Sequence, residues 1–256
     1  MRDSRAVSLT LRQARYQQKM FWRNAAAAMF TFLFPLMFLV IFSTLNGGER
    51  IKSRGGITFV TYFMPGILAF GIISATYTNL AIGTVFQREE GILKRIRGTP
   101  IPPWAFMAGN ILSSLAVGLL LTVITLFLGI VVYDVTYQAH TTPGLLAALV
   151  VGSACFCALG LALSAFVPNA DAAPAIVNFA VFPLVFVSGI FFPMDGAPAW
   201  LQNVAKAFPV RPLADALQYV FDPRTKGWGI NGVDLAVMAA WFVAGLVIAR
   251  RSFRWT

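Results

Sequence analysis

Residues 25–45 read AAAAMFTFLFPLMFLVIFSTL, an unbroken apolar run without Lys, Arg, Asp or Glu. A bilayer core about 30 Å thick is crossed by about 20 helical residues, so this run is long enough to span a membrane. Its apolar residues are continuous and do not alternate, which favours a helix over a strand of a β-barrel. The run is also longer than the roughly 7–15 apolar residues of a signal peptide, and no small-x-small cleavage site follows it. We therefore expect it to remain as a membrane anchor.

Further apolar runs follow along the chain, and Asp234 at the edge of the last is their only charged residue. The sixth run is the shortest and has the least distinct boundaries. Together with the first run they predict an all-α integral membrane protein with six transmembrane helices. The five later runs are Thr58–Phe86, Trp104–Tyr133, Gly144–Val167, Ala172–Phe192 and Val233–Ala249.

The composition agrees with this class of protein. Of the 256 residues 58% are apolar and 12% are charged, about half of the roughly 25% expected of a soluble domain. These values exclude a soluble globular protein, a disordered chain and a free nucleic-acid binder. The net charge is +10. With six spans, thirteen of the 20 Lys and Arg residues lie in segments 1–24, 87–103 and 250–256 on one side. The positive-inside rule then places both termini in the cytoplasm.

Residues 1–24 predict an amphipathic helix that precedes the membrane domain of residues 25–256. On a helical projection five basic residues fall within one arc of about 80°, and five apolar residues fall on another. Such a helix is suited to the cytoplasmic face of a membrane, with its basic side toward anionic lipid headgroups. The alternative is an ordinary basic flank without this role. The basic residues are Arg5, Arg12, Arg15, Lys19 and Arg23, and the apolar ones are Val7, Leu11, Ala14, Phe21 and Trp22.

The second cytoplasmic loop, residues 88–98, contains a short amphipathic stretch. Ile92, Leu93 and Ile96 share one helical face, charged residues take most of the rest, and Gly98 and Pro100 are helix-ending signals. Two interpretations are equally compatible with these residues. The stretch is either solvated turn material or a docking element with an apolar wedge and orienting charges.

Residues 193–232 form an external loop that is too long and too apolar for a plain connector. Two stretches of helical periodicity flank the break Pro209-Val210-Arg211-Pro212. We expect two short helices on or within the outer leaflet, either buried by protein or lying at the interface as a re-entrant pair. The alternative is a simple surface hairpin.

Residues that carry chemistry are scarce. His140 is the only histidine, no metal-binding or nucleophilic constellation accompanies it, and no GxxxxGK[ST] phosphate loop is present. We therefore expect no catalysis and no cofactor in this chain. Cys155 and Cys157 lie two residues apart on a helix and point in different directions, so we expect small core residues. Among the polar residues of the spans, Asn79 and Asn178 are amides that need partners, within the helices or in a substrate path.

Two motifs resemble signatures of the ABC-2 type permeases, the transmembrane subunits of ABC exporters. The first is the run from Glu89 to Pro100, EEGILKRIRGTP, after the second span. The second is FVSGIFFP at residues 186–193, followed by Pro198, Trp200-Leu201 and PVRPLADAL at residues 209–217. The resemblance covers nearly the whole chain and is nearest in character to daunorubicin-resistance-type drug exporter permeases. Pro212 departs from the family pattern, which bears on the substrate subclass.

The resemblance implies a bacterial plasma membrane protein of the type V ABC exporter kind. Two permeases, as a homodimer or heterodimer, pair above two copies of a nucleotide-binding protein that binds ATP and Mg. Loop 88–98 is then the coupling helix, and the N-terminal helix is the connecting helix. The residues implied to contact the ATPase are Glu89, Glu90, Gly91, Ile92, Leu93 and Arg95. The second and fifth helices are implied to line the path, where the candidate residues are Thr78, Asn79, Asn178, Phe182 and Phe186.

A path without charged residues favours a hydrophobic or amphiphilic cargo, such as a drug, a lipid or a lipid-linked glycan, moved out of the cytoplasm or inner leaflet. Three other classes of protein compete with this interpretation. An ATP-independent transporter or scramblase needs no ATPase partner, and an intramembrane transferase needs clustered His, Asp or Glu at membrane depth. A purely structural subunit needs no amphipathic docking loop.

Overall fold

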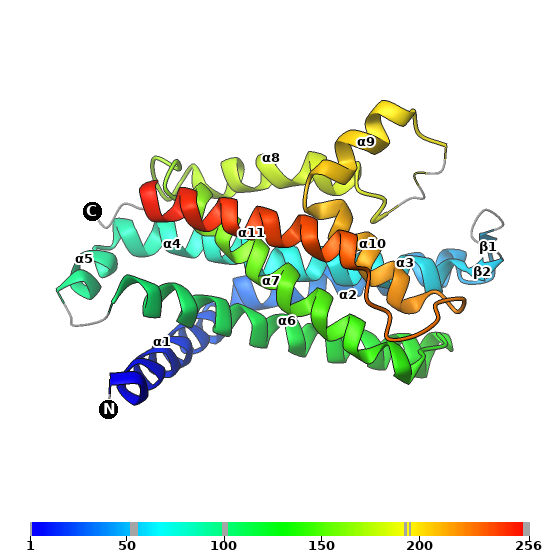
Figure 1. Cartoon of the computed structure of the whole chain (residues 1–256), viewed down its shortest axis with the longest axis horizontal. Coiled ribbons are helices and arrows are strands. Elements are labelled where there is room, and N and C mark those ends of the chain that lie inside the picture. The colour runs from blue at the N-terminus through cyan, green and yellow to red at the C-terminus, as the bar shows by residue number, and fades with distance from the viewer. Residues whose placement is uncertain (1, 52–55, 99–101, 192–193, 195, 253–256) are drawn as a thin grey trace.

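The computed structural model describes residues 2–51, 56–98, 102–191, 194 and 196–252, and it is mostly helical (Figure 1). The helices are α1 (Arg2–Arg23), α2 (Ala25–Asn46), α3 (Phe59–Ile73), η2 (Ser74–Thr78), α4 (Asn79–Glu89), α5 (Ile92–Arg97), α6 (Pro103–Tyr133), η3 (Ala139–Thr141), α7 (Thr142–Ser164), α8 (Ala173–Phe186), α9 (Ala199–Ala207), α10 (Val210–Phe221) and α11 (Gly232–Ser252). Strands β1 (Arg50–Ile51) and β2 (Ile57–Thr58) pair antiparallel, a small feature that the sequence did not predict.

Within the described residues, five helical segments are long and apolar enough to cross a membrane. They correspond to five of the six expected apolar runs, with ends close to the expected ones, and give the architecture of a multi-pass membrane protein. The five segments are Ala25–Asn46, Phe59–Glu89, Trp104–Tyr133, Ala139–Ser164 and Gly232–Ser252.

The fifth expected run, Ala172–Phe192, does not form one long helix. Its helix α8 has 14 residues, about 21 Å at 1.5 Å per residue, which is short of a 30 Å core. The helix ends at Phe186, and Gly189 then takes a left-handed conformation with φ +82°, which interrupts a right-handed helix. The expected length was therefore wrong. That this run crosses the membrane as a sixth span stays a prediction, and Phe192 lies outside the described residues.

The centre of the bundle is α3. Every residue from Val60 to Ile73 is buried, and α2, α6, α7 and α10 pack around this helix. The second span is therefore enclosed by the chain's own helices, whereas α2 and α11 lie at the outside with few buried residues. The turn η2 directly follows α3 in the chain. Its backbone N–H at Asn79 donates to the carbonyl of Ser74, five residues earlier, which makes it a π-helical turn. Such turns are often found at functional sites.

The expected pair of helices between spans is present as α9 and α10. Nine of the twelve residues of α10 are buried, and the helix packs against α3, α7 and α11 inside the bundle. A simple surface hairpin is therefore wrong for α10. Helix α9 is more exposed and stands at the edge of the bundle (Figure 1). Pro193, the expected start of this region, lies outside the described residues.

The start of α1, the short α5 and the end of α11 lie at one end of the bundle, and β1 and β2 lie at the other (Figure 1). The described parts of the segments that carry twelve of these thirteen basic residues therefore gather at the same end, and the thirteenth, Arg254, lies outside the described residues. We call this the α5 end.

A close backbone approach ties η2 to α7. A Cβ atom built on Gly160 of α7 would lie 2.8 Å from the carbonyl oxygen of Tyr77, closer than real Cβ contacts. Gly232, at the start of α11, has open space around the same position. Glycine at position 160 thus allows the two helices to pack closely.

We expect Gly160→Ala to destabilise the folded protein by about 1–3 kcal/mol, because overpacking forces the two backbones apart. Gly232→Ala is the matched control and should be neutral. The check is the thermal unfolding midpoint of both variants, purified in the same detergent. Equal midpoints would show that the approach at Gly160 does not constrain the bundle.

Candidate functional site

The segment expected to dock a partner is a sharp helix break at the α5 end. Helix α4 ends at Glu89, and Gly91 adopts φ +70°, a left-handed conformation that glycine takes without steric cost. Helix α5 then begins at Ile92 and ends at Arg97. Thr99 and Pro100 of the motif lie outside the described residues.

Two charged side chains at this break hold the connection between α7 and α8. The Arg88 guanidinium donates to the carbonyl oxygens of Ser164, at 3.0 Å, and of Val167. The adjacent Glu89 carboxylate accepts from the backbone N–H of Ala170 at 2.9 Å. We call Arg88 and Glu89 the loop clamp. Arg88 was not among the expected site residues, because its partners are backbone atoms some 80 positions away.

The exposed surface of the break differs in part from the expected one. Glu90, Lys94 and Arg95 are exposed and Ile92 is half-buried. Leu93 is completely buried, so its expected role as half of an apolar wedge toward a partner was wrong. Helical periodicity placed Leu93 on the apolar face without showing that this face packs on the chain itself.

Helix α1 packs along α6, and its buried face takes in only part of the expected apolar face. Gln13 and Ala14 are buried, and the Gln18 amide donates to the Ser113 carbonyl at 2.7 Å. Val7 and Leu11 are exposed, as are Arg12, Arg15, Lys19 and Arg23. The helix thus presents an apolar strip and a basic strip side by side on its free surface.

The five residues expected to line a substrate path separate into two places. Asn79 lies at the start of α4, where its amide donates to the Thr31 hydroxyl at 2.6 Å, and half-buried Thr78 precedes it. Phe182 and Phe186 lie on α8 and line an apolar groove. Asn178 is half-buried on the same helix and is not among the residues that line the groove.

The groove at Phe182 and Phe186 has a volume of about 250 Å³ and eight phenylalanines among its nine lining residues. Aromatic rings in series connect it to α2 and α3; Phe38, for example, lies 6.3 Å from Phe191 between centroids. We call this the aromatic groove. It offers dispersion contacts and no hydrogen bonds, and is lined by Phe34, Phe38, Phe42, Phe63, Phe70, Phe182, Val185, Phe186 and Phe191.

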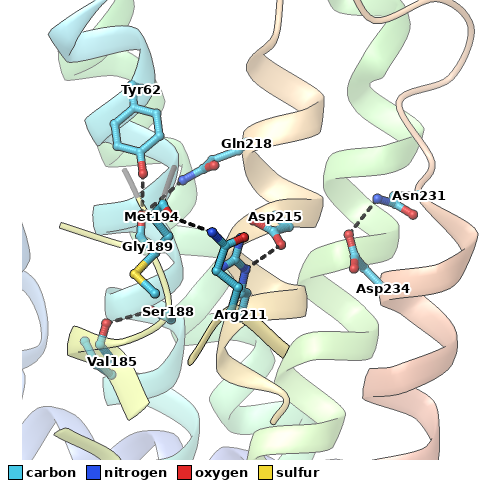
Figure 2. Close-up of polar contacts among 11 residues, drawn as sticks. Tyr62, Val185, Ser188, Gly189, Met194, Arg211, Asp215, Gln218, Asn231 and Asp234 are labelled. Carbon is cyan, nitrogen blue, oxygen red and sulfur yellow. Dashed lines mark hydrogen bonds and ion pairs between the residues drawn. The ribbon is translucent and has the colours of Figure 1, made fainter. Parts of the chain in front are cut away.

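Beside the aromatic groove, the second motif is fastened to the core (Figure 2). The Tyr62 hydroxyl on α3 donates to the Gly189 carbonyl at 2.6 Å, and the Gln218 amide on α10 donates to the same oxygen at 3.3 Å. On α10, Arg211 pairs with Asp215 at 3.2 Å. These contacts hold the chain that follows α8 against α3, which fixes one wall of the groove. Phe192 and Pro193 of the motif lie outside the described residues.

A second hollow, about 130 Å³, lies between α1, α2, α4 and α6. Its polar lining is made of uncharged amides and hydroxyls, and we call it the amide cavity. A wider hollow of about 450 Å³ shares six of its residues and extends to Arg23 and Glu90. Of the residues expected to line a path, only Asn79 lines this cavity. The other amides and hydroxyls come from α1, α4, α6 and the N-cap of α2. They are Gln17, Asn24, Thr84, Gln87, Asn110, Ser113 and Ser114.

No group of three or more His, Cys, Asp or Glu residues that could hold a metal occurs in the described part of the chain. Cys155 and Cys157 are both buried and unbridged, as expected for core residues.

Comparison with known proteins agrees with the motifs. A family model described as ABC-2 type transporter matches residues 10–221. The chain is 26% identical over 206 residues to the inner membrane transport permease YadH of Escherichia coli K12, covering 78% of this chain and 74% of the relative. It is 26% identical over 231 residues to the daunorubicin resistance ABC transporter permease protein DrrB1 of Streptomyces coeruleorubidus, covering 87% and 77%. It is 22% identical over 160 residues to the probable multidrug ABC transporter permease YbhR of E. coli K12, covering 62% and 43%.

The loop clamp generates a prediction that concerns structure alone. We expect Glu89→Gln to speed hydrogen exchange at Ala170 about tenfold or more, because a hydrogen bond to a charged group contributes about 1.5–3 kcal/mol. Glu90→Gln changes the neighbouring exposed carboxylate and is the matched control. Exchange followed by mass spectrometry on peptides covering residues 165–172 measures both. Identical exchange in the two variants would contradict the clamp.

Proposed function

Because the chain belongs to the ABC-2 type transporter family, we propose that it is the permease subunit of an ATP-driven ABC exporter whose ATP hydrolysis is supplied by a separate nucleotide-binding protein. The observation that carries the proposal is the α5 end, where an exposed charged helix break is bonded to the bundle by the loop clamp. The name of the relative YadH as an inner membrane permease supports a bacterial inner membrane location. The basic α5 end then faces the cytoplasm with both termini.

The nucleotide-binding protein docks at α5 in this proposal. Glu90 and Arg95 are exposed there with opposite charges, and half-buried Ile92 offers apolar surface between them. A cleft with complementary charges would take this segment in one orientation. Two such proteins bind ATP and Mg beneath a pair of permeases, formed by two copies of this chain or by this chain with a related one.

The clamp offers a mechanical route from the ATPase to the cargo. A push on α5 acts on Arg88 and Glu89, which hold the carbonyls of Ser164 and Val167 and the N–H of Ala170. That connection leads directly into α8, which carries Phe182 and Phe186 of the aromatic groove. For ATP to drive export, the cargo must bind the inward and outward states with different affinities.

The aromatic groove supports a hydrophobic or amphiphilic cargo. Its lining offers no polar side chain that would offset the desolvation of a charged group. The printed names of DrrB1 and YbhR, as daunorubicin resistance and multidrug permeases, favour drug-like cargo and outward transport, with lipids and lipid-linked glycans as further members of the class.

We expect Phe186→Ala to reduce ATP-dependent export of a neutral hydrophobic dye, Nile red, about tenfold, because one wall of the groove loses its ring. Phe179, also on α8, is 81% exposed and is not among the groove residues, so Phe179→Ala is the matched control. The measurement is dye efflux from cells that produce equal amounts of each permease together with its nucleotide-binding protein. Equal loss in both variants would argue against the groove as the path.

We expect Arg95→Glu to abolish most cargo-stimulated ATPase activity of the assembled transporter, because the reversed charge opposes the partner's surface. Insertion and folding should be unchanged, since Arg95 is exposed. Lys226→Glu, an exposed reversal in the loop between α10 and α11, is the control. Full stimulation in Arg95→Glu would contradict docking at α5, and dye transport without any ATPase would favour an ATP-independent transporter or scramblase.

A further inference from the structure

One residue that lines the amide cavity is a glycine with open space at its Cβ position. Gly83 lies in the interior of α4 and lines both the cavity and the wider hollow. A Cβ atom built at this position meets no atom within 4 Å. Glycine is unfavourable inside a helix compared with alanine, and here no close packing requires it, in contrast to Gly160. The missing side chain leaves space that is free for something else.

Three residues that line the cavity carry buried amide atoms without partners among the described residues. Asn110 is 1% exposed, and neither its Nδ2 nor its Oδ1 has a hydrogen-bond partner among the described residues. The Gln87 amide donates to Gln17 Oε1 at 3.3 Å. Gln17 Nε2 and Gln87 Oε1 take no part in that bond. Both atoms are buried and have no hydrogen-bond partner among the described residues. All three residues line the amide cavity.

These free atoms determine what the cavity would bind. Dry cavities in proteins are apolar, whereas buried amides need a hydrogen-bond partner. Two of the four atoms are donors and two are acceptors, and an amide keeps one end of each kind whichever way it is turned. Hydroxyl groups both donate and accept, so several hydroxyls on one ligand satisfy such a set. No Asp, Glu, Lys or Arg lines the cavity, so a charged group would lose its hydration without compensation.

We propose that the amide cavity binds the uncharged, polyhydroxylated head group of an amphiphile, of the chemical class of an alkyl glycoside. The head group lies among Asn110, Gln17 and Gln87, over the open position at Gly83. The apolar part leaves through the wider hollow past Ile82 and Phe86, which line it; Phe86 is 43% exposed on α4. The inference rests on the proposed transport function only for the origin of the ligand, which is either the cargo or a glycolipid of the bilayer.

Binding is tested on the full-length permease in phosphatidylcholine nanodiscs. The probe is an alkyl β-glucoside with a photoreactive diazirine in its tail, and two further probes carry the same tail with a phosphocholine or a sulfate head. We expect saturable labelling by the glucoside at least tenfold above both charged heads. Gly83→Leu, which fills open space, should reduce it tenfold or more, and Gly83→Ala should retain most of it. Equal labelling by the three heads, or labelling unaffected by Gly83→Leu, would overturn the proposal in favour of a water-filled cavity.

A second variant separates binding from structural support. Asn110→Leu removes two unpartnered polar atoms at similar size, so the empty permease should keep or raise its thermal unfolding midpoint. The upward shift of the midpoint caused by the glucoside should disappear. A lowered midpoint with an unchanged ligand shift would show that Asn110 supports the structure and would overturn its role in binding.

The origin of the ligand is resolved with the assembled transporter. Release of bound glucoside on addition of ATP and Mg identifies the head group as part of the cargo. Saturable, Gly83-dependent binding without ATP-driven release identifies a resident glycolipid, and it supports the site while contradicting transport of this class. Failure of the transport proposal is seen separately, as absence of any cargo-stimulated ATPase activity while glucoside binding persists.

Discussion

A helix without an exposed face needs neighbours on every side, and α3 has them in α2, α6, α7 and α10. Within a bilayer its peptide groups must be satisfied inside the protein, and its side chains must pack on partners that are held in place themselves. Tyr62 supplies one such hold by donating to Gly189 (Figure 2). The aromatic groove, helix α10 and the turn η2 are all built against this central helix.

Neighbouring charged residues around the break between α4 and α5 have different surroundings. At the α5 end, Arg88 and Glu89 bond to backbone atoms at the α7–α8 connection, and Glu90 and Arg95 are exposed beside them. Arg88 and Glu89 therefore connect the loop to the bundle, and the proposed function assigns recognition of a partner to the neighbouring Glu90 and Arg95. In the proposed function rigid attachment matters, because a loose loop would absorb a push without passing it to α8.

The apolar runs were sufficient to predict most of the helices, because a run of about twenty uncharged, apolar residues is typical of a membrane-spanning helix. The family was indicated by the two motifs at residues 89–100 and 186–217. They did not predict the end of α8, which depends on the conformation of Gly189, or the burial of Leu93, which depends on contacts within the fold. Phe182 and Phe186 were expected to line a path and share one groove, whereas Asn79 lies in another hollow. Asn110, Gln17 and Gln87 meet only through the packing of separate helices, so no spacing in the sequence connects them.

The wide turn η2 has a geometric consequence for α4, the part of the second span that follows it. A π-helical turn holds one residue more than the α-helical turn it replaces, and each residue of an α-helix rotates the chain by about 100°. The turn at Ser74–Thr78 therefore offsets the azimuth of α4 against α3 by that angle. Asn79, Gly83 and Gln87 stand one above another at intervals of four, and the offset points this column at α1, α2 and α6. An uninterrupted helix would aim the same column toward a different neighbour, so a single surplus residue determines which side of the span is polar.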